Sequence, residues 1–394
     1  MPDFLTPATE LFEFTRSLRR DFHAHPELGF QEVRTAAVVA RELKTLGLEV
    51  ATGIGKTGVV ALLAGEKPGG QGRTVMARFD MDALPIAEET GAEYASQNLG
   101  VMHACGHDGH TAIGLTVARM LVDTREAWSG TVKFVFQPAE EGMGGAPCMI
   151  ADGVLENPRP DLAVGLHLWN DKPVGWLGIA GGPVMAAAEI FRLRVTGKGG
   201  HGAAPHQAID PVLAAAQIVT ALQGIVSRNV SPLDTAVITV ATIHGGEAFN
   251  VIPPVVEMSG TIRTFETGVR RRVLERFRQV VHAVADACEC QVALDMEALT
   301  PAVFNHPQAA AYVRTAAGQM LPDFQVETRF ATMGSEDMAF FLQEVPGCFF
   351  FVGSANADKG LNAAHHHPRF DFDEGVLPQA AALMAGAIVN MLEG

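Results

Sequence analysis

Residues 7–167 alternate between short apolar runs of strand length and amphipathic runs of helix length. Apolar side chains recur at helical spacing over residues 7–22, 36–46 and 111–123. Strand-length apolar runs occur at residues 57–64, 74–79, 131–136 and 161–167. Strands that alternate with helices favour a mostly parallel sheet covered on both faces. The pattern therefore predicts an α/β fold for this part of the chain.

The pattern changes near residues 181–183. The elements predicted from residue 189 to residue 296 follow the order β-α-β-β-α-β, which is the ferredoxin-like plan. After residue 299 the earlier kind of segment returns, with helices at 308–321 and 377–392 around a strand at 348–352. A chain of 394 residues also exceeds what one core usually supports. We therefore predict one domain from residues 1–183 and 299–394, with an α+β domain, residues 184–298, inserted into it.

Composition excludes several classes of protein. The formal net charge is −15, so we expect no nucleic-acid partner and no anionic membrane partner. No apolar run reaches about 18 residues, and the N-terminus lacks the pattern of a signal peptide. Five cysteines without framework spacing argue for a reducing compartment, so the expected location is the cytoplasm.

Residues 102–110 hold three histidines, one cysteine and one aspartate. Cys105 and His107 are two residues apart, and on an extended strand they would point the same way. Thiolate, imidazole and carboxylate are the ligand types of a transition-metal site. A polar loop that happens to be rich in histidine is the alternative. Of the remaining residues, we expect His103 and Asp108 to support the ligands and His110 to begin the next helix.

Acidic and histidine side chains follow three of the predicted strands. Asp80 and Asp82 follow residues 74–79, and the pair Glu140-Glu141 follows residues 131–136. The strand over residues 161–167 is expected to end on His167. Because ligands of open α/β sheets bind outside the carboxyl ends of the strands, we expect these side chains to share one crevice.

A metal-ligand set can be collected from these segments. It contains Cys105, His107, Glu141, His167 and one of the three histidines at 365–367. No tight finger spacing links the ligands, which excludes a small structural zinc module. Ligands from separate segments instead suit a two-metal hydrolytic site.

The adjacent carboxylates of Glu140 and Glu141 repel each other unless a cation lies beside one of them. The division of labour that we predict is Glu141 on a metal and Glu140 free as the general base. A solvated acidic turn is the alternative.

The inserted domain offers candidates for substrate contacts. Glycines on both sides of His201 would let it approach a ligand closely. Asn250 and Arg263 suit the binding of a substrate carboxylate, although Arg263 could be an ordinary strand-face arginine.

Nine motifs together resemble the M20 metallopeptidase family. They occur in family order and begin at His23-Ala-His-Pro, Asp80-Met-Asp-Ala-Leu-Pro, Met102-His-Ala-Cys-Gly-His-Asp-Gly-His, Phe136-Gln-Pro-Ala-Glu-Glu, Gly165-Leu-His, Gly199-Gly-His-Gly, Asn250-Val-Ile-Pro, Gly260-Thr-Ile-Arg and His366-His-Pro. They are most similar to the amidohydrolase branch, which contains hippurate hydrolases, indole-acetyl-amino-acid hydrolases and N-acetyl-diaminopimelate deacetylases.

The resemblance implies a catalytic domain with two divalent metal ions (zinc, manganese, cobalt or nickel) and a smaller lid domain that forms a homodimer or homotetramer. The implied ligands are Cys105, His107, Glu141, His167 and, from the family's His-x-Pro pattern, His366. Further roles are also implied: Glu140 as the base, His201 as a donor to the developing oxyanion, in its own site or across the dimer, and Asn250 with Arg263 as carboxylate contacts.

The chain departs from the pattern of many M20 peptidases at one position. Asp80 stands where those peptidases have a liganding histidine, which is usual in the amidohydrolase branch and leaves its role open. Asp82 is expected to orient a ligand. Glu336 and Asp337, in the turn that starts at Met333, are expected to support the site.

These observations predict metal-dependent hydrolysis of the amide bond of N-acyl amino acids, such as N-benzoyl or N-acetyl amino acids, to a carboxylic acid and an amino acid. A dipeptidase or carboxypeptidase acting on short peptides is the alternative within the family. A metal-holding binding protein without turnover is the alternative from another class, but such a protein has no need of the free carboxylate of Glu140.

Overall fold

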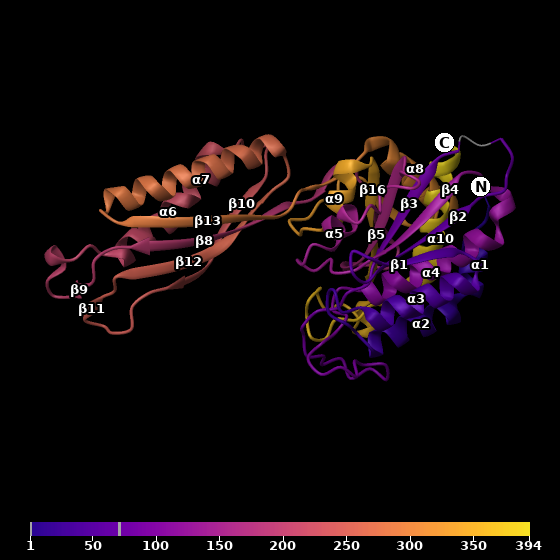
Figure 1. Ribbon diagram of the computed structural model, residues 1–394, viewed down its shortest axis with the longest axis horizontal. Coiled ribbons are helices and arrows are strands. Elements are labelled where there is room, and N and C mark those ends of the chain that lie inside the picture. The colour runs from indigo at the N-terminus through magenta and orange to yellow at the C-terminus, as the bar shows by residue number, and fades with distance from the viewer. Residues whose placement is uncertain (1, 70–71) are drawn as a thin grey trace. The chain divides into compact units, whose positions relative to one another are not determined.

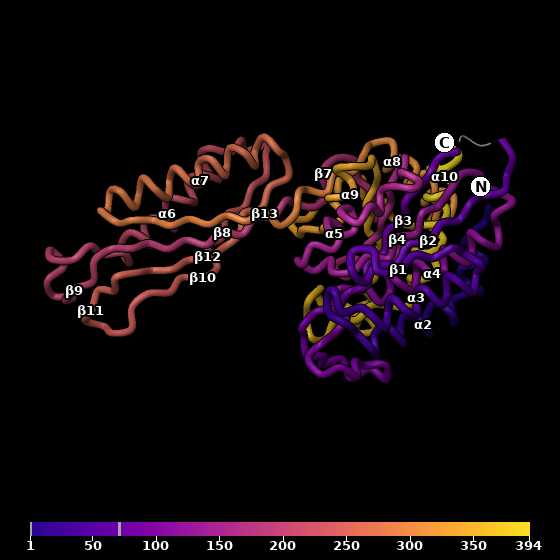
Figure 2. Tube along the Cα trace, in the orientation of Figure 1, coloured from indigo at the N-terminus to yellow at the C-terminus, as the bar shows by residue number. Residues whose placement is uncertain are grey.

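The chain folds around two separate hydrophobic cores. The computed structural model describes residues 2–69 and 72–394, and Figures 1 and 2 trace the chain from the first unit into the second and back. The first unit comprises residues 1–184, 303–331 and 336–394, and the second comprises residues 185–302 with 332–335.

An eight-stranded sheet forms the centre of the first unit (Figure 1). Four central strands run parallel in the order β4 (Thr131–Gln137), β3 (Thr74–Asp80), β5 (Leu162–Pro173) and β16 (Gly347–Ala355). Beyond β4, β2 (Gly58–Ala64) and β1 (Glu49–Ile54) are antiparallel. Beyond β16 lie β6 (Trp176–Gly178) and β15 (Gln325–Glu327). Strand β3 is buried along its whole length, as expected of a parallel strand covered on both faces. The α/β prediction is confirmed.

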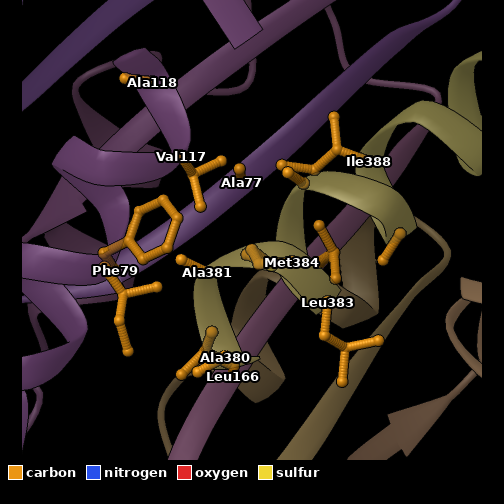
Figure 3. Close-up of a cluster of buried hydrophobic side chains, with 14 of the residues drawn as sticks. Ala77, Phe79, Val117, Ala118, Leu166, Ala380, Ala381, Leu383, Met384 and Ile388 are labelled. Atoms are coloured by element: carbon orange, nitrogen blue, oxygen red, sulfur yellow. The ribbon is translucent and has the colours of Figure 1, made fainter. Parts of the chain in front are cut away.

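The helices of the first unit cover this sheet. They are α1 (Leu5–Glu10), α2 (Phe12–Ala24), α3 (Val33–Thr45), α4 (His107–Asp123), α5 (Gly145–Ala151), α8 (Pro307–Met320), α9 (Met338–Glu344) and α10 (Leu377–Glu393). Figure 3 shows Val117 of α4 and Met384 of α10 packed with Phe79 of β3 and Leu166 of β5. Helix α4 can lie this close because Gly114 has no side chain: a Cβ there would lie 2.7 Å from the Phe79 ring.

One segment, residues 374–393, is long and apolar enough to cross a membrane. However, 83% of its apolar window is buried inside the protein, as expected of a core helix. It corresponds to η4 (Glu374–Val376) and α10.

The second unit has the predicted ferredoxin-like plan. Its sheet has the strand order β10 (Ala236–His244), β12 (Val255–Thr264), β8 (Ala187–Thr196) and β13 (Gln291–Thr300), and all neighbours are antiparallel. The helices α6 (Pro211–Asn229) and α7 (Thr267–Ala287) share a core with it. Phe191, Leu193 and Val195 of β8 enter this core, whereas Arg192 and Arg194 alternate with them and are exposed. This period of two allows only one face of the strand to be buried.

Short elements complete the fold. Strand β9 (Gly200–His201) pairs with β11 (Val251–Ile252), and β7 (Gly182–Met185) pairs with β14 (Val303–Asn305). The 3₁₀ helices η1 (Arg125–Ala127), η2 (Pro205–Gln207) and η3 (Ala357–Lys359) lie in connections.

Three predicted boundaries are wrong. The helix over residues 7–22 is two helices, because the backbone bends at Leu11. His110 does not begin α4: the helix begins at His107, after Gly106 in the left-handed conformation (φ 93°). Strand β5 does not end on His167, because its pairing with β16 continues as far as Pro173. In the last two cases polar residues interrupt the apolar pattern from which a helix or a strand is predicted.

Candidate metal centre

Five side chains predicted as ligands converge in the first unit. Cys105 precedes α4, His107 is the first residue of α4, and Glu141 follows β4. His167 lies in β5, and His366 lies in the loop before α10. Their ligand atoms form two groups that share Cys105, one with His107 and His167 and one with Glu141 and His366; within each group the atoms lie within 4.8 Å of one another. A shared ligand between two groups is the geometry of a paired metal site.

The parallel strands bring these residues to one level. Strand β3 pairs with β5 only as far as Arg78 and Gly165, so His167 lies level with the carboxyl end of β3 although β5 continues. The Sγ of Cys105 lies 3.4 Å from Nε2 of His167. The backbone N–H of His366 donates to the carbonyl of Ala104 (2.8 Å), which fixes the two loops together.

Hydrogen bonds set the orientation of two of the imidazoles. Nδ1–H of His107 donates to the carbonyl of Asp82 (2.9 Å), and Nδ1–H of His167 donates to the carbonyl of Leu168 (2.7 Å). Each bond leaves Nε2 as the atom with a free lone pair, which is how liganding histidines are usually held. Among the described residues, the buried Nε2 of His107 has no hydrogen-bond partner, and it lies 4.0 Å from the buried Oε1 of Glu141. An unpartnered buried ring nitrogen that lies near a carboxylate oxygen fits a cation between the two atoms.

The electrostatics of the second group favour the same conclusion. Burial and the nearby carboxylate of Glu141 raise the pKa of the Cys105 thiol. Hydrogen bonds to Cys105 and Glu141 raise the pKa of His366 to about 10. Oε1 of Glu141 lies 3.2 Å from Nε2 of His366. These groups therefore favour a positive charge between them, and a divalent cation supplies such a charge while keeping the thiolate ionised.

Glu140 lies between the ligand candidates and a second acidic group. Its carboxylate is within 4.8 Å of His107 and Glu141 in one group, and of Glu336 and Asp337 in another. Burial and the neighbouring carboxylates of Glu336 and Glu141 raise the pKa of Glu140 well above its ordinary value. The backbone N–H of Asp337 donates to Oε1 of Glu140 (3.3 Å), which orients this carboxylate.

The backbone before Glu140 is also held in place. Ala139 adopts a left-handed conformation (φ 54°) that a residue with a side chain rarely occupies. Its N–H donates to the buried carboxylate of Glu32 (2.8 Å), which also accepts the Thr57 hydroxyl (2.5 Å). This strained turn changes the direction of the backbone between β4 and the carboxylates of Glu140 and Glu141.

Asp82 and Asp80 both support the site. Oδ2 of Asp82 accepts the backbone N–H of Glu141 (3.0 Å), while its carbonyl orients His107. Asp80 accepts Nδ1–H of His110 (2.6 Å) and Nη1–H of Arg78 (2.8 Å). Its carboxylate is therefore already engaged by two donors. This gives Asp80 a supporting place, which the sequence left open.

Sequence reasoning missed Arg78, which is buried in β3. Its guanidinium donates to Gln137 (2.7 Å), Glu336 (2.8 Å) and Asp337 (3.1 Å) in addition to Asp80. The signal was present in the sequence: an arginine within an apolar strand run must find partners, because burying an unpaired charge is costly.

A further buried network anchors the first turn of α4. Arg19 donates to Asp108 (2.8 Å) and to Asp371 (2.7 Å), and Nδ1 of His23 lies 2.7 Å from Asp108. Asp108 therefore anchors the start of α4, which carries His107, and its support of the ligands stays a prediction. His103 is buried, but neither ring nitrogen has a hydrogen-bond partner among the described residues, and burial lowers its pKa to about 4.

The predicted contacts of the second unit fall into two places. His201 of β9 pairs with Val251 of β11, next to Asn250. Arg263 lies near the other end of β12 and pairs with Ala188 at the start of β8. Eight residues of strand separate Arg263 from Val255, which is about 26 Å. Within one second unit, Asn250 and Arg263 therefore do not meet on a single carboxylate, because they lie at opposite ends of the sheet.

Comparison with known proteins gives one family. A family model described as peptidase family M20/M25/M40 matches residues 76–390. The chain is 39% identical over 376 residues to N-acetyl-L-cysteine deacetylase of Bacillus subtilis, covering 95% of this chain and 88% of the relative. It is also 39% identical over 389 residues to thermostable carboxypeptidase 1 of Saccharolobus solfataricus, covering 97% of each chain.

A solved structure extends the comparison. The YXEP protein of Bacillus subtilis, described as a dinuclear metal-binding peptidase from the M20 family, is 34% identical to this chain. The two folds agree with a TM-score of 0.85 over 98% of this chain and 99% of that one. Together with the grouped ligand atoms, this relative supports binding of divalent metal ions.

Proposed function

Since the chain belongs to peptidase family M20/M25/M40 and is a hydrolase, we propose that it hydrolyses the amide bond of N-acyl amino acids. The observation that carries the proposal is the meeting of Cys105, Glu141 and His366 with His107 and His167, beside the carboxylate of Glu140. The N-acetyl-L-cysteine deacetylase, an amide hydrolase by its name, is similar to this chain over nearly its whole length.

The side chains divide the chemistry between them. Two divalent cations held by the five ligands would polarise the amide carbonyl and make water more acidic. Glu140 accepts a proton from the attacking water and then delivers it to the leaving nitrogen. The surroundings that raise the pKa of Glu140 suit both steps, because a carboxylate with a raised pKa binds a proton more readily. The N–H of Asp337 keeps this carboxylate in place.

The identity of the metals belongs to the proposal as well. A thiolate and three imidazoles favour zinc, cobalt or nickel, while the carboxylate of Glu141 also suits manganese. Metal analysis of the purified protein, followed by reconstitution with each ion, distinguishes these candidates.

The second unit would supply substrate contacts. His201 is the proposed donor to the oxyanion, and Arg263 and Asn250 are the proposed carboxylate contacts. Because Arg263 lies far from the other two within one unit, we propose that two subunits of a cytoplasmic homodimer or homotetramer share these roles. Light scattering gives the oligomeric state. Recovery of activity on mixing the inactive variants Glu140→Gln and His201→Ala tests the sharing, and absence of recovery contradicts it.

Glu140→Gln tests the proposed base. We expect turnover of N-acetyl amino acids to be abolished while metal content and fold remain normal, because glutamine cannot accept the proton. Glu93→Gln, at an exposed position of the same unit, is the matched control and should keep full activity. Near-normal turnover by Glu140→Gln would contradict the assignment of Glu140 as the general base.

A carboxypeptidase is the second candidate, because the Saccharolobus relative bears that name at a similar identity. Both reactions cleave an amide bond. Amine release from hippurate, N-acetyl amino acids and a dipeptide panel separates them. A protein that only holds metal would release amine from none of these substrates.

A further inference from the structure

A group of aromatic rings begins at one of the metal-ligand candidates and continues away from it. His167 and Trp169 are two residues apart on β5, so they share one face of the strand, and their ring centroids lie 5.5 Å apart. His365, which precedes His366, lies 5.1 Å from His167 and 4.9 Å from Trp169. The rings of Trp169, His365 and Phe330 are called the aromatic wall below.

Neighbouring aromatic rings pack against the rings of the wall and hold them in fixed orientations. Trp169 meets the edges of Phe351 (5.2 Å) and Phe330 (5.9 Å), and Phe330 meets Phe351 (5.0 Å) and Trp176 (4.9 Å) in the same way. Phe351 and Trp176 are only 1% and 4% exposed. Such edge-to-face contacts fix the orientation of each ring. The wall therefore keeps its shape without a ligand.

The rings of the wall are only partly covered. Trp169, Phe330 and His365 are half-buried, whereas the rings behind them are buried. Keeping aromatic surface in water is unfavourable, and clustered apolar surface beside a site commonly marks where a ligand binds.

One polar atom of the wall also lacks a partner. Nε2 of His365 accepts the backbone N–H of Asn170 (3.1 Å), so in the neutral ring the proton is on Nδ1. Nδ1 is buried and makes no hydrogen bond with any residue in the described part of the chain. A donor left unpaired at the junction between the wall and the ligands is available to a substrate oxygen.

We propose that the aromatic wall binds an aromatic or large apolar group of the substrate beside the scissile amide bond, and that Trp169 and Phe330 determine this specificity. The inference rests on the proposed function, because it places the substrate amide at the ligands next to His167. Two positions on the substrate can carry such a group: the acyl part, as in N-benzoylglycine, and the amino-acid side chain, as in N-acetylphenylalanine. The unpaired Nδ1–H of His365 would donate to an oxygen of the same substrate.

The test compares three substrates in wild type, Trp169→Ala, Phe330→Ala and the conservative Trp169→Phe. We expect kcat/KM for one of the two aromatic substrates to fall about 10- to 100-fold in the alanine variants, from loss of the buried ring contact. N-Acetylalanine, which has no large group, should change by less than about threefold. Trp169→Phe should recover much of the loss. Phe304→Ala, at a 52% exposed position of the same unit, is the matched control.

The outcomes separate the two proposals. The aromatic substrate that loses rate shows whether the wall takes the acyl group or the side chain. The proposal is contradicted if kcat/KM falls equally for all three substrates, or if it falls for neither aromatic substrate. If the wild type hydrolyses none of the three, the proposed function fails. Calorimetry with Glu140→Gln then still tests the wall, because binding of N-benzoylglycine or N-acetylphenylalanine should weaken at least tenfold on adding Trp169→Ala, and unchanged binding of both overturns it.

Discussion

Replacing Arg78 by methionine removes one charge from the centre of a buried carboxylate group. The guanidinium is fully buried and donates to Asp80, Glu336 and Asp337 as well as to Gln137. Methionine has an unbranched side chain and fills much of the same volume, so the packing loss is small. The substitution therefore tests the charge rather than the cavity.

The expected cost follows from the charges left behind. Removing one partner of a buried ion pair costs about 3–5 kcal/mol. Asp337 contributes little of this cost, because burial already raises its pKa to about 8 and it can become neutral. Asp80 contributes more: although burial opposes its ionisation, His107 and Arg78 hold its pKa well below the ordinary value. We expect a loss near the lower end, about 3 kcal/mol, from the total of about 5–15 kcal/mol that domains usually have.

The same reasoning fixes the pH dependence. A carboxylate with a depressed pKa in the folded state stabilises the fold above its unfolded pKa, and this contribution is lost as the pH falls. In Arg78→Met the pKa of Asp80 rises, so the contribution is already reduced at neutral pH. The difference in the free energy of unfolding between wild type and Arg78→Met should therefore become smaller as the pH falls toward the ordinary pKa of aspartate.

Urea unfolding followed by tryptophan fluorescence measures this loss. The three tryptophans, Trp128, Trp169 and Trp176, all belong to the first unit, so their signal reports on it. Arg159→Met is the matched control, because that guanidinium is 53% exposed and should cost less than about 1 kcal/mol. Adding Glu336→Gln to Arg78→Met should recover at least about 1 kcal/mol. The reasoning is refuted if Arg78→Met loses no more free energy of unfolding than Arg159→Met does. It is also refuted if the difference between wild type and Arg78→Met becomes larger at low pH.

Three further outcomes are expected. Chelation should abolish amide hydrolysis, and zinc, manganese or cobalt should restore it; activity indifferent to thorough chelation excludes the metal mechanism. Glu336→Gln removes a negative neighbour that raises the pKa of Glu140, so the acidic limb of kcat/KM should move to lower pH. An unmoved limb contradicts that assignment. Gly114→Ala should destabilise by about 1–3 kcal/mol in urea unfolding, because its Cβ meets Phe79, whereas Gly318→Ala has open space and should not.

The sequence was sufficient to select the ligand candidates but not to predict their geometry. Cys105 and His107 were recognisable by residue type and by spacing. The helix that starts at His107 was not, because its first turn is polar and carries no apolar period. Strand β1 was missed because it is an edge strand with mostly exposed side chains. In each case the segment lacks the apolar periodicity from which the element could have been predicted.

The separation of Arg263 from Asn250 illustrates the limit for residues in different motifs. Each motif favoured carboxylate binding when taken alone. Their distance follows from the length of β12, because Asn250 precedes this strand and Arg263 lies near its far end. Motif order therefore predicts the set of residues more reliably than it predicts which of them meet.

The buried polar groups next to the ligand candidates are connected by a series of hydrogen bonds. The backbone of β5 donates to His110, His110 donates to Asp80, and Arg78 donates to both Asp80 and Asp337. The N–H of Asp337 then donates to Glu140. Since neighbours in one hydrogen-bond network do not contribute independently, the placement of Glu140, the proposed base, and the placement of His167 in β5 should be coupled. This explains why an arginine is kept in a strand that is otherwise apolar: one planar group with several donors joins both sides of the site, which a lysine in the same place would not do.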